Sequence, residues 1–423
     1  MTEASLHQHS PDTGSSRELP WDDSQTARAV IDLDAIAHNG QLLGKTASTD
    51  WMGIIKADAY GHGTLPVARA CLNAGATWLG VAQLSEALQL RKLLTAGGEE
   101  HARILCWLLP PRSPQEAAAE NSALRRAVRQ EIDLSVPSPD VLAAIVAAAR
   151  AEHTVARVHL KVDTGMGRGG ATDEALPALA AAVKRAETAG DVTLVGLWSH
   201  LSRADEPNSG STETHLKHFL HARETVQAAG LYPQICHLAA TGGALWHPDT
   251  RQDLVRLGIG LYGLSPNPDV ASSEQLGLRP AMRLEARLTQ VKTIAAGQPV
   301  SYGGTWTAPT DRWIGLVPLG YGDGLPRAAS SCGPVSVGGQ RTQIVGRVCM
   351  DQVMIDLGPA IAGAEAPAQP GDVAVLWGDP QLSPGVPSAD DWAAAVGTIN
   401  YEIVTRVGPR VPRVYVGAGT LAT

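Results

Sequence analysis

The chain has 423 residues, of which 44% are hydrophobic, and its formal net charge at pH 7 is -8. This length allows two or three domains, or one barrel with an addition, and a negative charge without a long basic run argues against nucleic-acid binding. No apolar stretch is long enough to span a bilayer, and residues 1–26 lack the basic and apolar regions of a secretory signal. We therefore predict a cytoplasmic protein whose residues 1–26 form a disordered tail.

The five cysteines are scattered along the chain and form no Cys-x-x-Cys pair. This spacing argues against a disulfide framework and against a zinc site, and it fits a reducing compartment. We expect no metal in this protein.

Between about residues 50 and 265, apolar β-prone runs alternate with helical patterns. The helical segments 138–151, 174–189 and 212–229 repeat apolar residues at spacings of three and four, and Gly190 and Gly230 are typical helix ends. Eight such units are typical of a (β/α)8 barrel, although an open doubly wound sheet gives a similar pattern. The eight runs are Met52–Lys56, Trp78–Val81, Ala102–Leu109, Ile132–Val136, Ala156–Val162, Leu194–Ser199, Ile235–Ala239 and Leu254–Tyr262.

After about Pro268 the pattern changes to short alternating strands separated by glycine and proline, which is typical of an all-β domain. The expected strands are Leu284–Ile294, Trp313–Leu319, Val335–Gly338, Gln343–Asp356, Asp372–Trp377 and Val411–Val416, with a helix over Asp390–Val396. The predicted fold is an N-terminal (β/α)8 TIM-type barrel over residues 27–270, followed by a C-terminal mostly β domain over residues 271–423.

Reactive side chains of a barrel follow the C-terminal ends of its strands. Lys56 ends the first run, where burial would depress the pKa of its amine, and a neutral amine can form a Schiff base with an aldehyde cofactor. The same position also suits a lysine that only extends into solvent. Arg168 lies in a glycine-rich segment after the fifth run, where it either binds an anionic group or is a surface arginine on a turn.

The later runs add a candidate phosphate site. Arg256 lies inside the eighth apolar run, where an unpaired charge is costly. Thr241, Gly258 and Ile259 fall where barrels often bind phosphate, although Thr241 also suits a tight turn. His200 follows the sixth run, where a lone histidine is more often structural. These residues predict a barrel enzyme with a strand-end lysine and a phosphate site, without selecting the reaction.

Four segments, found in family order, resemble the alanine racemase family over nearly the whole chain after residue 27. The most specific is Lys56-Ala57-Asp58-Ala59-Tyr60-Gly61-His62-Gly63, which resembles the family's cofactor-lysine motif. The others are Ser301-Tyr302-Gly303-Gly304, Arg347-Val348-Cys349-Met350-Asp351 and Asn400-Tyr401-Glu402. The resemblance implies a pyridoxal-phosphate-dependent racemase that interconverts L-alanine and D-alanine and supplies D-alanine for peptidoglycan.

The resemblance also implies roles for the matching residues. Lys56 holds pyridoxal phosphate and is the base for the D-enantiomer. Tyr302 is the base for the L-enantiomer, and it is contributed by the partner chain of a head-to-tail homodimer. His200 and Arg256 are the implied relay, with Arg256 facing the pyridine nitrogen. The implied cofactor-binding residues are Lys56, Tyr60, Arg168, His200, Thr241, Arg256, Gly258, Ile259 and Tyr401. The implied substrate-binding residues are Arg168, Met350 and Asp351, and Lys161 matches a lysine that many members carbamylate.

One segment departs from the family, because Ala240-Thr241-Gly242-Gly243 stands where Asn-Ser-Ala-Ala is usual. Three alternatives use the same cofactor: a broader-specificity racemase, a barrel-type amino-acid decarboxylase and a non-catalytic pyridoxal-phosphate-binding protein. Broad-specificity racemases tend to be exported, whereas this chain lacks a secretory signal. The glycine-rich phosphate loop expected of the decarboxylase is not seen. A non-catalytic carrier resembles the barrel alone, whereas this chain also has the segments with Tyr302 and Met350. An NAD-dependent oxidoreductase is disfavoured because the chain lacks the glycine fingerprint.

Overall fold

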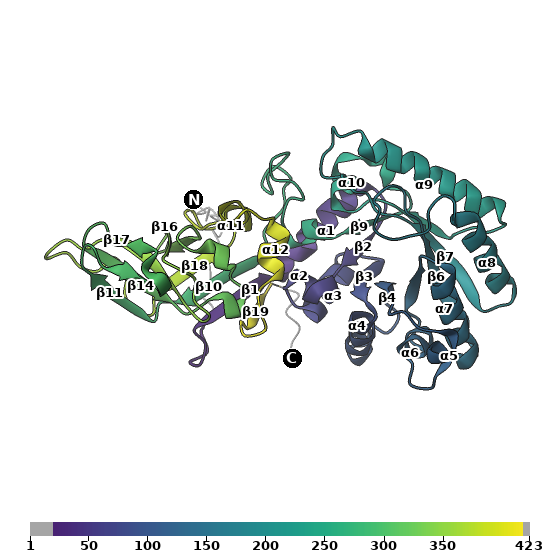
Figure 1. Cartoon of the computed structure of the whole chain (residues 1–423), viewed down its shortest axis with the longest axis horizontal. Coiled ribbons are helices and arrows are strands. Elements are labelled where there is room, and N and C mark those ends of the chain that lie inside the picture. The colour runs from purple at the N-terminus through teal and green to yellow at the C-terminus, as the bar shows by residue number, and fades with distance from the viewer. Residues whose placement is uncertain (1–19, 418–423) are drawn as a thin grey trace, which may run out of the picture.

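The computed structural model describes residues 20–417, and its two domains lie side by side along the long axis of the molecule (Figure 1). Eight parallel strands of the first domain follow the order β8-β7-β6-β5-β4-β3-β2-β9, and a single parallel bridge between Ala240 and Arg256 joins the two ends. The predicted barrel is therefore confirmed, and the open doubly wound sheet is wrong. The strands are β2 (Asp50–Ile54), β3 (Trp78–Gln83), β4 (Arg103–Leu108), β5 (Asp133–Val136), β6 (Ala156–Lys161), β7 (Val192–Trp198), β8 (Ile235–His237) and β9 (Leu254–Leu257).

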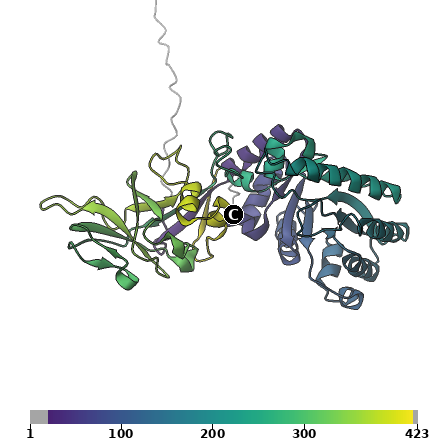
Figure 2. The same ribbon diagram turned by 45° about the horizontal axis from the view of Figure 1, so that its top comes forward.

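Amphipathic helices cover the outside of this barrel (Figure 2). Helix α7 (Pro139–Glu152) is representative: the Ser138 hydroxyl caps its first turn, and Leu142, Ile145 and Ala149 are buried at spacings of three and four. Such a cap contributes about 1 kcal/mol, and burial of each large aliphatic side chain contributes about 1.5–3 kcal/mol. The other helices are α1 (Leu33–Ala47), α2 (Lys56–Tyr60), α3 (Thr64–Asn73), α4 (Leu84–Ala96), α5 (Pro114–Ala118), α6 (Ala123–Arg129), α8 (Leu176–Thr188), α9 (Ser211–Ala228) and α10 (Thr241–Trp246).

The interior of the barrel contains aromatic and titratable side chains where branched aliphatic residues are usual. Trp198 stacks on the imidazole of His237 with ring centroids 5.5 Å apart, and Trp78 meets His159 edge-on at 5.1 Å. The indole N–H of Trp198 donates a hydrogen bond to Ser135. The barrel core is thus partly polar, and its polar atoms require hydrogen-bond partners inside the barrel.

The second domain is built on a nine-stranded sheet in the order β11-β14-β17-β16-β15-β18-β10-β1-β19, which confirms the predicted mostly β domain. Its elements are β1 (Ala27–Asp32), β10 (Met282–Arg287), β11 (Gln290–Ile294), β12 (Pro299–Val300), β13 (Trp306–Thr307), β14 (Arg312–Val317), β15 (Pro334–Val337), β16 (Gln340–Val345), β17 (Val353–Pro359), β18 (Val373–Trp377), β19 (Arg413–Val416), α11 (Ala389–Val396) and α12 (Asn400–Thr405), with β12 and β13 forming a separate ribbon.

Three details of this domain differ from the sequence analysis. The single strand expected over Leu284–Ile294 is two strands, because β10 pairs with β1 and β18 whereas β11 pairs with β14. Strand β1 lies in a range assigned to the barrel, yet it pairs with β10 and β19. The single strand expected over Gln343–Asp356 is two strands, because the chain turns at Gly346, where φ is 74° and a side chain would collide with the Val300 carbonyl. Of the predicted tail, residues 1–19 lie outside the described residues, whereas the Trp21 ring packs 4.0 Å from the Arg28 guanidinium.

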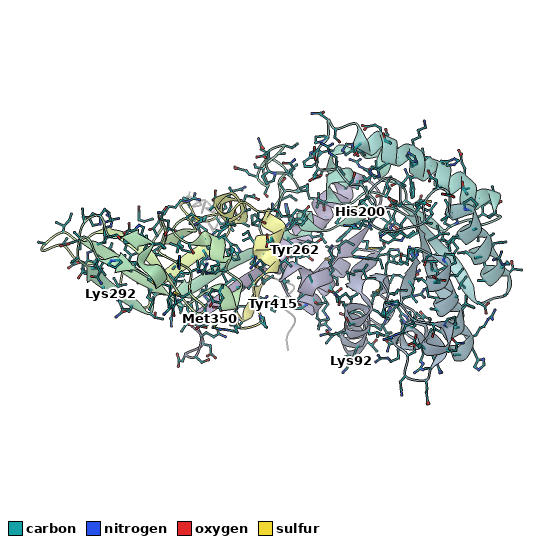
Figure 3. The ribbon with its side chains drawn as sticks, viewed as in Figure 1. Lys92, His200, Tyr262, Lys292, Met350 and Tyr415 are labelled. Atoms are coloured by element: carbon teal, nitrogen blue, oxygen red, sulfur yellow. The ribbon has the colours of Figure 1, made fainter. Side chains whose placement is uncertain are left out.

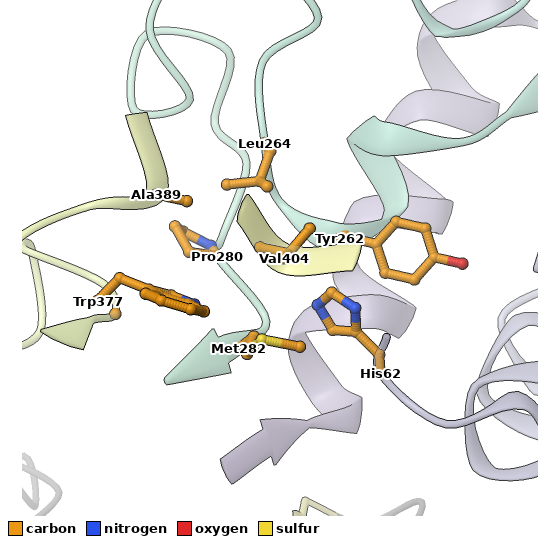
Figure 4. A pocket seen from close by; sticks show the side chains of 9 residues that line it. His62, Tyr262, Leu264, Pro280, Met282, Trp377, Ala389 and Val404 are labelled. Atoms are coloured by element: carbon orange, nitrogen blue, oxygen red, sulfur yellow. The ribbon is translucent and has the colours of Figure 1, made fainter. Parts of the chain in front are cut away.

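The domains meet where α12 packs on α2 (Figure 1). A Cβ atom at Gly61 would lie 2.5 Å from the Val404 carbonyl oxygen, so only glycine allows this approach. A small cavity at the same junction is lined by side chains of both domains, including His62, Tyr262 and Trp377 (Figure 4).

Over residues 20–417, no helix is both long and apolar enough to cross a membrane. The same part of the chain contains no group of three or more His, Cys, Asp or Glu residues placed to hold a metal ion.

Candidate active site

The candidate residues of the first domain gather at the C-terminal ends of the barrel strands. Lys56 begins α2 after β2, Lys161 ends β6, and His200 lies two residues after the end of β7. Thr241 begins α10 after β8, and Gly258 directly follows β9. Barrel geometry therefore brings together residues that are up to about 200 positions apart in the sequence.

A left-handed turn positions Lys56. The four residues after it have φ values between 52° and 53°, a conformation that non-glycine residues rarely adopt and that costs roughly 1–2 kcal/mol per residue. Two carboxylates hold the turn: Glu86 accepts a hydrogen bond from the Ala57 N–H at 2.7 Å, and Asp58 accepts two from Thr64 at 2.9 Å. The four residues are Ala57, Asp58, Ala59 and Tyr60.

The Lys56 amine lies in a partly buried aromatic setting. Its Nζ atom is 5.8 Å from the centre of the Tyr60 ring and 5.9 Å from that of Trp107. Burial and the positive charge of Arg168 lower the pKa of Lys56, while Glu86 opposes the shift. A lowered pKa increases the fraction of neutral amine, which is the nucleophilic form and the form that accepts a proton.

Arg256 is buried in the mouth of the barrel, and acceptors surround its two terminal nitrogens. Nη1 donates to the His237 carbonyl at 2.9 Å, and Nη2 donates to the Ser199 and Leu238 carbonyls at 2.7 and 2.8 Å. His237 Nδ1 and His200 Nδ1 each lie 3.1 Å from one of these nitrogens. Within residues 20–417, the hydrogen bonds of Arg256 use only Nη1 and Nη2, so the Nε–H is the donor left for a ligand.

Several positive charges converge at this mouth. Burial is the largest cause that holds the pKa of His200 well below its ordinary value, and four cationic side chains lower this pKa further. They are Arg256, Arg168, Lys161 and Lys56. Burial and Arg168 also lower the pKa of Arg256 to about 9, and burial, Arg168 and Arg256 lower that of Lys161 to about 8. A neutral His200 among these cations suits an anionic ligand.

The predicted phosphate residues lie next to one another. Thr241 Oγ1 accepts a hydrogen bond from the Gly258 N–H at 3.1 Å, and a Cβ atom at Gly258 would come within 2.8 Å of the Tyr60 hydroxyl. The Tyr60 and Tyr401 rings are 6.3 Å apart, and burial raises the pKa of both hydroxyls, so they remain donors. Ile259 begins the short helix that follows Gly258.

Three predicted residues lie in the other domain of the same chain. Tyr302 is 71% exposed and lines a pocket together with Lys292. Figure 3 shows Lys292 in the β domain, far from His200 in the barrel. Met350 is 52% exposed, and Asp351 pairs with Arg410 at 2.8 Å. A single chain therefore does not bring Tyr302 to Lys56.

Sequence reasoning missed two contributors to the site. One is His237, whose Nδ1 contacts Arg256 Nη1. A buried arginine requires hydrogen-bond acceptors, and this requirement could have indicated a polar neighbour such as His237. Glu86 holds the turn after Lys56, and no sequence pattern indicated it.

Comparison with known proteins identifies the family. The model for the alanine racemase N-terminal domain matches residues 31–266, and that for the C-terminal domain matches residues 281–415. Alanine racemases of Beutenbergia cavernae and Thermobifida fusca are 52% and 48% identical to the chain over 92% and 93% of its length, and over 98% and 99% of theirs.

Solved structures agree. The crystal structure of alanine racemase from D-cycloserine-producing Streptomyces lavendulae superposes with a TM-score of 0.87 at 42% identity, covering 94% of this chain and 98% of that one. The alanine racemase of Streptomyces coelicolor A3(2) gives a TM-score of 0.86 at 45% identity, covering 92% and 98%. The resemblance of the four sequence segments is thus confirmed, and the chain belongs to the alanine racemase family.

Proposed function

We propose that this member of the family interconverts L-alanine and D-alanine with pyridoxal phosphate as cofactor, in a head-to-tail homodimer. The observation that carries the proposal is the convergence of four cationic side chains on a neutral His200 at the barrel mouth, beside a strand-end lysine with a lowered pKa. A phosphate, a phenolic oxygen and a substrate carboxylate are anionic groups that such a site accommodates.

The residues at the mouth fit pyridoxal phosphate. Lys56 provides the amine for a Schiff base, and the unpartnered Nε–H of Arg256 is a donor for the pyridine nitrogen. The Tyr60 and Tyr401 hydroxyls, Thr241, and the backbone of Gly258 and Ile259 would hold the phosphate. Arg168 would contact the phenolic oxygen and the substrate carboxylate. When bound, the cofactor supplies a conjugated electron sink that acidifies the Cα–H bond of the amino acid.

Racemisation requires one proton to leave one face of Cα and another to arrive at the opposite face. We assign Lys56 Nζ to the face from which D-alanine is deprotonated and the hydroxyl of the partner's Tyr302 to the other. His200 and Arg256 would relay charge between the second base and the ring. Since an arginine does not readily give up its proton, Arg256 would leave the ring nitrogen unprotonated and weaken the electron sink, which limits side reactions.

Met350 and Asp351 remain proposed substrate residues through the same dimer. Both lie in the β domain with Tyr302, and Met350 is exposed in the single chain. A partner barrel seated against this domain would place the Met350 backbone at its mouth, where the substrate carboxylate is expected.

The departure at residues 240–243 has a packing explanation. A Cβ atom at Gly242 would lie 2.9 Å from the Ala204 carbonyl oxygen, and one at Gly243 would lie 2.8 Å from the Ala239 Cβ. The two alanines that are usual in the family therefore do not fit this backbone without a shift. Ala240 lacks the amide of the usual asparagine, while Thr241 keeps the hydroxyl.

Replacement of Thr241 by valine is expected to weaken pyridoxal phosphate binding about tenfold, because one charge-assisted hydrogen bond to the phosphate is lost. Fluorescence titration of the apoenzyme with the cofactor measures the effect. Thr250→Val is the matched control, since Thr250 is buried nearby but donates only to the His247 carbonyl. Equal affinities of the two variants would contradict a phosphate role for Thr241.

Lys161 is expected to take up carbon dioxide as a carbamate, with uptake increasing as the pH rises through about 8. Above that pH most of the amine is neutral and can attack carbon dioxide, releasing one proton; at pH 7 only about a tenth is neutral. The product is an anion placed to orient Arg168. Carbon-13 NMR of enzyme equilibrated with labelled bicarbonate measures uptake, and Lys161→Ala should lose the signal. A carbamate signal retained in this variant would contradict the assignment.

The proposed reaction is tested by proton exchange at Cα in deuterated water, starting from each enantiomer of alanine separately. Both should incorporate deuterium and converge on a racemic mixture. Cofactor binding without exchange of either enantiomer would refute the proposal and favour a non-catalytic pyridoxal-phosphate-binding protein. Comparable rates with larger amino acids would favour the broader-specificity racemase.

A further inference from the structure

A buried row of side chains runs from Arg256 into the interior of the barrel. His237 Nδ1 lies 3.1 Å from Arg256 Nη1, and His237 Nε2 lies 3.0 Å from His159 Nδ1. His159 Nε2 in turn lies 3.5 Å from Asp133 Oδ1, at the outer limit of a hydrogen bond. All four side chains are buried, and the mechanism proposed above uses only Arg256.

The row fixes the position of each imidazole proton. Arg256 can only donate, so His237 Nδ1 accepts and the His237 proton lies on Nε2. That N–H donates to His159 Nδ1, which places the His159 proton on Nε2 as well. Within the described residues, His159 Nε2 makes no hydrogen bond of regular geometry, and the Asp133 carboxylate that faces it at 3.5 Å is an electrostatic partner for its N–H. Reversal of any one link would set two N–H groups against each other or leave two lone pairs facing.

The charges along the row agree with this arrangement. Burial lowers the pKa of His159 and holds that of His237 well below the ordinary value, so both imidazoles are neutral. Burial would raise the pKa of Asp133, but His159, Arg103 and Arg157 outweigh it and lower that pKa. Arg103 donates to both Asp133 oxygens at 2.9 and 3.3 Å, and Arg157 donates to Oδ2 at 3.2 Å. The row therefore ends on an ionised carboxylate.

We infer that Asp133 and His159 are positioning residues for the cofactor ring, because they hold His237 as the acceptor that keeps Arg256 oriented with its free Nε–H toward the barrel mouth. The inference that Arg256 contacts the cofactor ring there rests on the proposed function. The order of donors and acceptors rests only on the contacts within this chain. Neither Asp133 nor His159 would touch the cofactor or the substrate.

The substitution Asp133→Asn should reverse the row. When its oxygen takes the Oδ2 position, an asparagine accepts from the Nε–H groups of Arg103 and Arg157. Its amide N–H then takes the Oδ1 position, where it faces His159 Nε2 and the bond from Arg103 Nη2 is lost. His159 would then carry its proton on Nδ1, and so would His237, whose Nδ1–H would oppose Arg256 Nη1–H. The guanidinium would have to turn away from its acceptors.

Neutron diffraction from crystals of the deuterium-exchanged holoenzyme locates these protons directly. Deuterium on Nε2 of both His159 and His237 is expected, and deuterium on Nδ1 of His237 would overturn the inference. In Asp133→Asn, deuterium should move to Nδ1 of His237, and the affinity of the apoenzyme for pyridoxal phosphate should fall about tenfold, as for other outer partners of a binding group.

Asp191→Asn is the matched control. Asp191 is also a buried barrel carboxylate held by two hydrogen bonds from one arginine, Arg150, at 2.8 and 2.7 Å. The Asp191→Asn variant should change the affinity for pyridoxal phosphate less than twofold. Equal losses of affinity in both variants would show that Asp133 has only a structural role and would contradict the inference. If the wild-type holoenzyme fails to racemise alanine, the proposed function fails, while the deuterium positions still decide this inference.

Discussion

Replacement of Lys56 by alanine is expected to lower racemisation of alanine in both directions by about 10⁴-fold, because a positioned acid–base group is lost together with the covalent anchor of the cofactor. Pyridoxal phosphate should still bind through the phosphate residues, but its absorption spectrum should be that of a free aldehyde. Polarimetry with each enantiomer and an absorption spectrum of the dialysed protein measure both effects.

The same substitution should not reduce the melting temperature. Burial of the Lys56 ammonium is unfavourable in the folded chain, as its lowered pKa indicates, so its removal relieves a desolvation cost. Lys92→Ala is the control for a general effect of losing a lysine, since Lys92 is exposed on α4. Activity of Lys56→Ala within tenfold of the wild type would contradict both roles assigned to Lys56.

A heterodimer of one Lys56→Ala chain and one Tyr302→Phe chain is expected to retain about half of the wild-type activity per dimer, although each homodimer is nearly inactive. If each site combines Lys56 of one chain with the partner's Tyr302, one of the two sites contains both lesions and the other contains none. Coexpression with two different affinity tags and sequential purification yields this species. A heterodimer as inactive as the homodimers would show that both bases come from one chain.

The Tyr302→Phe homodimer provides a second readout. Its racemisation should fall by about 10²–10⁴-fold, since one of the two proton-transfer groups is missing. Lys56 should still exchange the Cα proton of D-alanine with deuterated water, without forming L-alanine. Equal loss of exchange from both enantiomers would argue against a division of the two faces between Lys56 and Tyr302.

Much of this fold was predictable because buried parallel strands are continuous apolar runs and each is followed by a helix. The same geometry placed Lys56, Thr241 and Gly258 at the mouth, since strand ends of a barrel meet on one face. Strand β1 was not assigned to its sheet, because its partners β10 and β19 lie about 250 and 380 positions further along the chain and leave no local mark.

Two features of the site had no sequence signal. The left-handed turn after Lys56 uses two alanines, an aspartate and a tyrosine, whereas only glycine announces positive φ angles in a sequence. The row from Arg256 through His237 and His159 to Asp133 crosses strands β9, β8, β6 and β5, so its members are neighbours only after the barrel has closed.

The pairing of β1 between β10 and β19 has a consequence during synthesis of the chain. Strand β1 leaves the ribosome first, but its antiparallel partner follows about 250 residues later and its parallel partner last. At roughly 5–20 residues per second, β1 waits about 12–50 seconds for its first partner, while the whole barrel sequence is synthesised between them. Until then β1 is an open strand edge that can pair with another nascent chain, and chaperone dependence should be concentrated in this interval.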